Sequence, residues 1–109
     1  MNLHSIKVGA HRYPIVRDSV ELTVEGDWAH HDPRNRTIRI DTRERPDNAV
    51  AEDLVHEVLH ALFLDSGQDK LDRDEEEAVC TILAPRLTAF MADNPAAVRE
   101  LLVMLGCDE

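Results

Sequence analysis

Long hydrophobic runs are missing from this 109-residue sequence, although 43% of its residues are apolar. No apolar stretch approaches the ~18 residues of a membrane span, so we expect no membrane partner. The N-terminus, MNLHSIKVGAHRY, lacks the basic stretch and apolar segment of a signal peptide. We therefore expect a cytoplasmic protein with a single domain, residues 1–109, because this length fills one hydrophobic core but not two.

Cysteine is also scarce. The two cysteines, Cys80 and Cys107, form neither a spaced metal motif nor a dense disulfide framework. Cys80 lies in an apolar helical stretch, and Cys107 lies near the end of the sequence. We expect a buried free thiol at Cys80 and a loose thiol at Cys107, rather than a disulfide between them.

Basic residues are few, and the charge is unevenly distributed. Lys and Arg number 12 against 22 Asp and Glu, a net charge of −10. Residues 1–46 carry 8 basic and 7 acidic side chains, whereas residues 47–109 carry 4 and 15. The acidic half would repel phosphate backbones, so we expect no nucleic-acid partner. The arginines between residues 34 and 45 have no aromatic residues between them and are typical of a solvated strand and loop surface.

The first half of the chain, residues 1–46, has strand patterns. SIKVGAHRYPIV and SVELTVEG contain β-branched residues in partial alternation. WAHHDPRNRTIRID predicts a hairpin, in which DPRN supplies the turn with proline at its second position. Ile38 and Ile40 then lie on one face of the second hairpin strand.

The second half, residues 47–109, has helical periodicity. Asp47 or Asn48 is expected to cap a helix that runs to about Asp65 and ends at Ser66-Gly67. Asp72 and Glu75 form a possible capping box for a second helix that runs to about Asp93.

Two prolines mark this helical half. Pro85 should bend the second helix, because it removes a backbone hydrogen bond. Pro95 suits the first turn of a short third helix, AAVRELLVML.

Strands followed by helices predict an α+β domain: a small N-terminal sheet of about three strands, with the helices packed on one face.

The stretch LVHEVLHALF, residues 54–63, contains the H-E-x-x-H pattern of zinc metallopeptidases. Four residues apart on a helix, His56 and His60 project from the same side, as two ligands of one Zn²⁺ must. Glu57 lies about 100° further round and can reach a metal-bound water as general base. The alternative is that both histidines are ordinary core residues that hydrogen-bond to neighbouring carbonyls. A glutamate beside them at this spacing favours the zinc site.

A third ligand must come from elsewhere. No histidine follows His60, which excludes the longer metzincin motif. The acidic run DEEE, residues 74–77, remains, although acidic residues also suit the first turn of any helix. If the second helix buries Val79, Cys80, Leu83, Leu87 and Phe90, a count of about 100° per residue places Glu76 within the buried face. We therefore predict Glu76 as the third ligand, with Glu77 as runner-up.

With these residues identified, the chain resembles small bacteriophage and prophage proteins of the minimal gluzincin type. The resemblance rests on HEVLHA at 56–61, EEAVCTILAPRL at 76–87 and DNP at 93–95, and covers roughly residues 28–98. It implies a thermolysin-like zinc site in a short sheet with an active-site helix and a glutamate helix. By this resemblance His56 and His60 are ligands, Glu57 is the general base, and a glutamate of residues 75–77 is the third ligand. A phage-encoded protein of this kind would act in the cytoplasm of its bacterial host.

Three functions remain open at this point. The first is a zinc-dependent peptidase acting on a peptide or protein substrate, with TIRID as the edge strand that binds an extended peptide. Tyr13, His30 and His31 are the available residue types for stabilising its transition state. The second is a non-catalytic phage or prophage protein with a structural zinc, closed by a fourth ligand such as His30 or His31. The third is an acidic interaction module with a vestigial motif.

Overall fold

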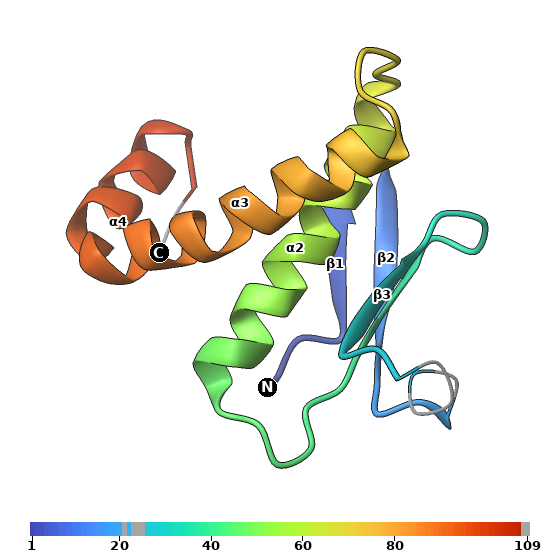
Figure 1. The fold of residues 1–109 in the computed structure, drawn as a ribbon. Helices are drawn as coiled ribbons and strands as arrows, with labels where there is room; N and C mark the ends of the chain where they lie inside the picture. The colour runs from blue at the N-terminus through green and yellow to red at the C-terminus, as the bar shows by residue number, and fades with distance from the viewer. Residues whose placement is uncertain (21, 23–25, 108–109) are drawn as a thin grey trace.

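A four-stranded sheet forms the first half of the chain in the computed structural model, which describes residues 1–20, 22 and 26–107 (Figure 1). Along the chain, the strands are β1 (Ser5–Val8), β2 (His11–Arg17), β3 (Ala29–Asp32) and β4 (Thr37–Ile40). Their spatial order is β1-β2-β4-β3, with a parallel pairing between β2 and β4 and antiparallel pairings at both sides. The α+β class is confirmed, with four strands where about three were expected.

The hairpin between β3 and β4 forms as predicted. Its first strand, and not its second, lies at the edge of the sheet. Asp32 Oδ1 accepts the backbone N–H groups of Arg34 and Asn35, which closes the turn. β4, the TIRI strand, lies between β2 and β3 and is therefore interior. The prediction that TIRID is the edge strand is wrong, because the parallel pairing with β2 covers its other side. β3 is the edge strand on this side of the sheet.

The prediction of a strand in SVELTVEG is also wrong for the described residues of its centre. Val20 and Leu22 are helical, and the remaining residues of its centre, 21 and 23–25, lie outside the described residues. Ser19 Oγ accepts the N–H of Leu22, and the carbonyl of Leu22 accepts the N–H of Gly26. Local capping and a helical turn outweigh the β propensity of these residues.

Three helices follow the sheet: α2 (Asp47–Ser66), α3 (Arg73–Asp93) and α4 (Pro95–Met104). α2 ends where predicted, at Gly67 in the left-handed conformation with φ of 66°. Its start has no side-chain cap, so the expected capping by Asp47 or Asn48 is wrong. Extended Pro46 is the N-cap instead, and its carbonyl accepts the first backbone N–H groups of the helix. In the described residues, no helix has the length and apolar character needed to cross a membrane.

α3 begins with the predicted capping box. Asp72 accepts the N–H of Glu75, and the Glu75 carboxylate accepts the N–H of Asp72. The helix continues through Pro85 to Asp93, and Pro95 starts α4 directly after Asn94.

The hydrophobic core lies between the sheet and α2. It contains Val8, Tyr13, Ile15, Ile38 and Ile40 from the strands and Val50, Leu54 and Ala61 from α2. α3 packs on α2, so the molecule has the order sheet, α2, α3 (Figure 1).

The buried side of α3 differs from the expected one. Cys80 and Ala84 are fully buried, but Leu83, Leu87 and Phe90 are 37%, 38% and 49% exposed. These three were expected in the core. The small residues let α3 approach α2 closely, whereas the C-terminal half of α3 extends past α2 and has little to pack against.

Candidate metal centre

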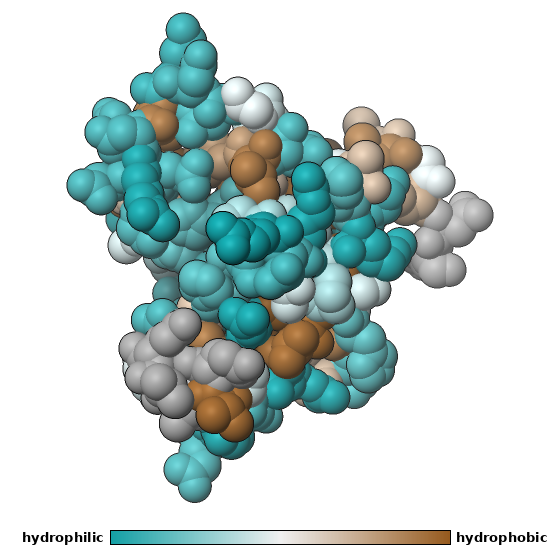
Figure 2. All heavy atoms as spheres, turned by 90° about the vertical axis from the view of Figure 1, so that its right-hand side faces the viewer, coloured by the Kyte–Doolittle hydropathy of each residue, from teal (hydrophilic) through white to brown (hydrophobic). Residues whose placement is uncertain are grey.

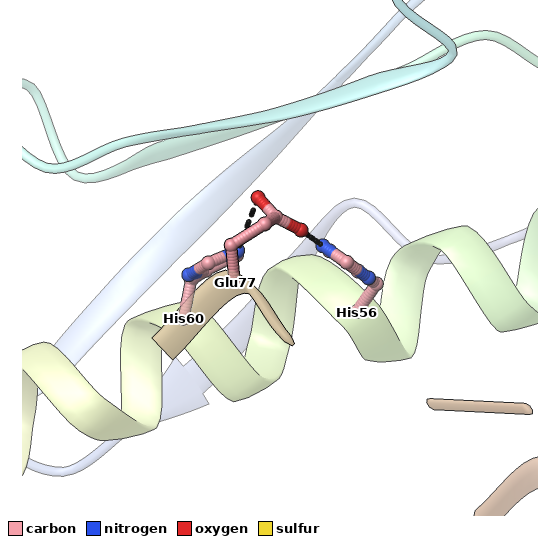
Figure 3. Close-up of side chains that lie close together, drawn as sticks. All are labelled: His56, His60 and Glu77. Atoms are coloured by element: carbon pink, nitrogen blue, oxygen red, sulfur yellow. Dashed lines mark ion pairs between the residues drawn. The ribbon is translucent and has the colours of Figure 1, made fainter. Parts of the chain in front are cut away.

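Two histidine rings on adjacent turns of α2 face a glutamate of α3 (Figure 3). The ring centroids of His56 and His60 are 5.0 Å apart. Glu77 lies across from both: its Oε1 is 2.6 Å from His56 Nε2, and its Oε2 is 3.4 Å from His60 Nε2. One ligand atom from each of these three residues lies within 4.8 Å of the others, as for atoms that share one metal ion.

The helix α2 presents this pair for a simple geometric reason. Its core-facing residues, including Leu54 and Ala61, pack on the sheet. The histidines at 56 and 60 lie beside that face, in the angle between the sheet and α3, where their side chains are 21% and 16% exposed. Here they are half-buried but still open to solvent on one side.

The two glutamates of α3 meet different atoms. Cys80 and Ala84 mark the line along α3 that faces α2, and Glu76 lies four residues before Cys80 on that line. The angular prediction that Glu76 points inwards therefore agrees with its position. However, its Oε2 meets the far nitrogen of His60, Nδ1, at 2.7 Å. Glu77, one residue further round, meets both Nε2 atoms.

A loop glutamine supports Glu76. Gln68 Nε2 donates to Glu76 Oε1 at 3.4 Å and to the carbonyl of Leu71 at 3.3 Å. Its Oε1 accepts the N–H groups of Lys70 and Leu71. A hydrogen-bonded chain thus runs from the α2–α3 loop through Gln68 and Glu76 to His60. Sequence reasoning missed Gln68, because nothing in its local pattern distinguishes it from any polar loop residue.

Glu57 is a half-buried carboxylate beside this group. Burial raises its pKa above the ordinary value, while the neighbouring His56 and His60 act in the opposite direction. The backbone N–H of His31, on the edge strand β3, hydrogen-bonds to it. The predicted general base therefore lies between the histidine pair and the edge strand.

Of the three residues expected to assist at the centre, His31 is the best placed. It pairs with Ile38, so its side chain lies on the sheet face that packs on α2. Its ring lies 5.5 Å from that of Tyr13, which is fully buried. His31 Nε2 is buried without a hydrogen-bond partner among the described residues. Burial lowers the pKa of His31, and the nearby His60 lowers it further.

A cavity of about 600 Å³ lies beside the histidine pair and is lined by His60 but not by His56. Its polar lining includes Glu57, His60, Glu76 and Glu77, and β3 contributes His30 and His31. Phe63 and Leu64 supply an apolar wall. The face of the molecule on the sheet side is mostly hydrophilic, with hydrophobic residues in separate patches (Figure 2).

The donor set fits a zinc ion. Two imidazole nitrogens and one carboxylate oxygen are the ligand types of catalytic zinc sites, which keep a fourth position for water or substrate. In a tetrahedral site with bonds of ~2.0–2.1 Å, ligand atoms lie roughly 3.4 Å apart, which matches the 3.4 Å between His60 Nε2 and Glu77 Oε2. The 2.6 Å between His56 Nε2 and Glu77 Oε1 is shorter, a direct hydrogen-bond distance, so this pair would have to separate to hold an ion between them. His31 is not part of the three-residue group that the described residues form.

A scan of protein-family models, a search of curated proteins and a search of solved structures each found no match to this chain.

Proposed function

We propose that this protein is a zinc-dependent metallopeptidase that hydrolyses peptide bonds. The observation that carries the proposal is the meeting of two histidine Nε2 atoms and the Glu77 carboxylate beside half-buried Glu57. Three of these residues, Glu57, His60 and Glu77, line an open cavity. A structural zinc site would need a fourth protein ligand. The described residues group only three donors at this point, which favours catalysis.

In this proposal the ligands are His56, His60 and Glu77, and Glu76 is a positioning residue. The Glu76 carboxylate holds His60 Nδ1 at 2.7 Å, which fixes the ring and turns Nε2 towards the ion. This arrangement exchanges the two glutamates relative to the sequence-based prediction. Glu76 lies on the side of α3 that faces α2, and its carboxylate extends to Nδ1 of His60. Glu77, one residue further round, is left to meet the Nε2 atoms.

The chain's own groups would carry the proton steps. A bound zinc ion would supply a Lewis acid that acidifies water and polarises the substrate carbonyl. Glu57 would take the proton of the attacking water and deliver it to the leaving amine. His31 Nε2, which has no partner among the described residues, would donate to the carbonyl oxygen as negative charge develops on it.

The substrate would bind as an extended strand along β3. β3 is the edge strand, and it contacts α2 more extensively than the other strands do. An edge strand offers backbone groups to a peptide, and the cavity beside it accepts side chains. On β3 the His31 N–H is already bonded to Glu57, so a peptide would pair with the other outward groups of the strand. The likeness to minimal gluzincins of phages and prophages belongs to the same proposal, as does action in a reducing bacterial cytoplasm, which suits two free thiols.

One rival has a specific observation behind it. The partnerless His31 Nε2 could close the site as a fourth ligand and make the zinc structural, as in a non-catalytic phage protein. Zinc content cannot separate the two, but activity can. A structural site would retain zinc and cleave nothing.

The test combines metal analysis with peptide cleavage. The purified chain is expected to hold one zinc, to lose it in His56→Ala and His60→Ala, and to cleave members of a mixed peptide library detected by mass spectrometry. Glu57→Gln should keep both fold and zinc but lose cleavage, because it touches water rather than metal. Full cleavage by Glu57→Gln, or unchanged zinc in both histidine variants, would overturn the proposal.

A further inference from the structure

The C-terminal helix is rich in apolar residues, interrupted by Arg99 and Glu100, and no side of it is buried. α4 contains no buried residue. Residues 101–105 read Leu-Leu-Val-Met-Leu, and each is exposed, with Met104 at 73% and Leu105 at 77%. The apolar side of an amphipathic helix is normally packed against another element rather than left in water.

The second half of α3 continues this apolar surface. Ile82, Leu83, Leu87, Phe90 and Met91 are all exposed. Four of them, from Leu83 to Met91, recur at helical spacing and form one stripe. We name residues 82–105, which contain this stripe and α4, the C-terminal arm.

The fold itself leaves the arm uncovered. α4 packs on α3, and α3 packs on α2 through its first half. The arm projects away from the sheet and lies at the opposite side of the molecule from β3 (Figure 1). Apart from buried Ala84, ten of its large apolar side chains therefore remain between 37% and 77% exposed.

The exposed area is large enough for a stable interface. Ten large apolar side chains of the arm are each at least one-third exposed. Together they leave on the order of 900 Å² of apolar surface, comparable to the ~800 Å² that each partner buries in a standard interface. Typical monomers carry largest patches of about 300–600 Å².

The charge is arranged to permit contact here. The described arm contains two basic residues, Arg86 and Arg99, and two acidic ones, Asp93 and Glu100. It is therefore neutral, although the whole chain carries −10. Residues 1–77 carry 10 basic and 18 acidic side chains, so the excess charge of the described chain lies outside the arm. Two arms can meet without like-charge repulsion while the acidic bodies stay apart.

We propose that the C-terminal arm is a homodimer interface, in which the arms of two copies pack about a two-fold axis as a four-helix unit. A second copy matches the surface in three respects: it is equally apolar, neutral and helical. A hairpin of two helices can cover the exposed apolar residues of α4 and the α3 stripe together. Each copy uses the same patch, so the assembly closes at two. The metal centres face outwards, because β3 lies on the other side of each copy.

Sedimentation of the full chain tests the proposal. The measurement runs in reductant, because exposed Cys107 could otherwise link copies covalently. Over about 1–200 µM, a range that suits an interface of standard size, the wild type should be a dimer. Leu105→Glu should weaken association more than tenfold. It removes no buried contact, so circular dichroism should show unchanged helix content.

The matched control is Val20→Glu, which makes the same charge change at a residue 75% exposed outside the arm. It should remain dimeric. Association should also strengthen with added salt, because salt screens the repulsion between the acidic bodies but not the apolar contact. Glu77→Gln should dimerise as the wild type does, which separates this interface from the zinc proposal.

Three results would overturn the interface. The first is a monomeric wild type at the highest concentration. The second is a dimer that survives Leu105→Glu, or that is weakened equally by Val20→Glu. The third is a monomer that binds lipid vesicles through residue 105, which would assign the arm to a membrane surface.

Discussion

The neighbouring glutamates of α3 offer the sharpest test of the proposed metal centre, because Glu→Gln changes charge without changing shape. Glu77 lies across from both Nε2 atoms, at 2.6 and 3.4 Å. Glu76 contacts only His60 Nδ1, at 2.7 Å. Glu75 faces neither histidine and closes the capping box with Asp72. Three identical substitutions at consecutive positions should therefore have three different effects on zinc affinity.

The expected magnitudes follow from these roles. Zinc binding of about 10–16 kcal/mol, shared among four ligands, gives roughly 3 kcal/mol per ligand. Glu77→Gln should therefore weaken zinc binding by about 100- to 1,000-fold. Glu76→Gln removes a group that only orients a ligand, and it should cost about 10- to 100-fold. Glu75→Gln should leave affinity unchanged, since glutamine also completes a capping box.

Competition with a chromophoric chelator at fixed pH measures all three affinities. Glu75→Gln is the matched control for general effects on the first turn of α3. A similar melting temperature of the zinc-free variants would show that the fold is intact. If Glu76→Gln weakens binding more than Glu77→Gln, the geometry described above assigns the ligand wrongly. If neither variant differs from Glu75→Gln, α3 takes no part in metal binding.

Three further predictions concern other parts of the molecule. Burial raises the pKa of the Cys80 thiol to about 12. At pH 8 a thiol reagent should therefore titrate only Cys107 in the native chain and both cysteines in denaturant. Two fast-reacting native thiols would contradict this. Gly9→Ala should lower the free energy of unfolding by about 1–2 kcal/mol, because φ is 61° there and the added Cβ would meet the Asp65 side chain. The loss of stability should be smaller in an Asp65→Ala background. An equal loss in both backgrounds would exclude that contact. His31→Phe should raise the free energy of unfolding by about 1 kcal/mol, because it removes a buried nitrogen that has no hydrogen-bond partner among the described residues. It should also lower any peptide cleavage. A variant that is less stable in a urea titration would show that the imidazole nitrogen has a hydrogen-bond partner.

Local signals in the sequence predicted most element boundaries. Gly67 ends α2, and Asp72 with Glu75 starts α3, as their capping chemistry indicates. These features depend on a few neighbouring residues and need no tertiary contact. The segment around Leu22 shows the limit of such reasoning: its β-branched composition favours a strand, but a serine cap and a buried leucine favour a helical turn.

The order of the strands could not be read from the sequence. TIRID precedes α2 directly, so it was expected at the sheet edge beside the metal centre. Its actual place is decided by a parallel pairing with β2, between segments far apart in the chain. Such non-local pairing leaves no periodic signal in either strand. As a result β3 is the edge strand, and its residues His30 and His31 line the cavity, whereas no residue of β4 does.

The sequence by itself determined that His56 and His60 share one side of a helix, with Glu57 a third of a turn away, because helical geometry depends only on spacing. It also predicted that Glu76 points inwards, although Leu83, Leu87 and Phe90, which entered that prediction as buried residues, are exposed. Only the tertiary structure decided which imidazole nitrogens meet which glutamate, because this depends on how closely α3 approaches α2. Small residues at Cys80 and Ala84 allow that approach. They carry Glu76 past the Nε2 atoms to Nδ1 of His60 and leave Glu77 to face both histidines.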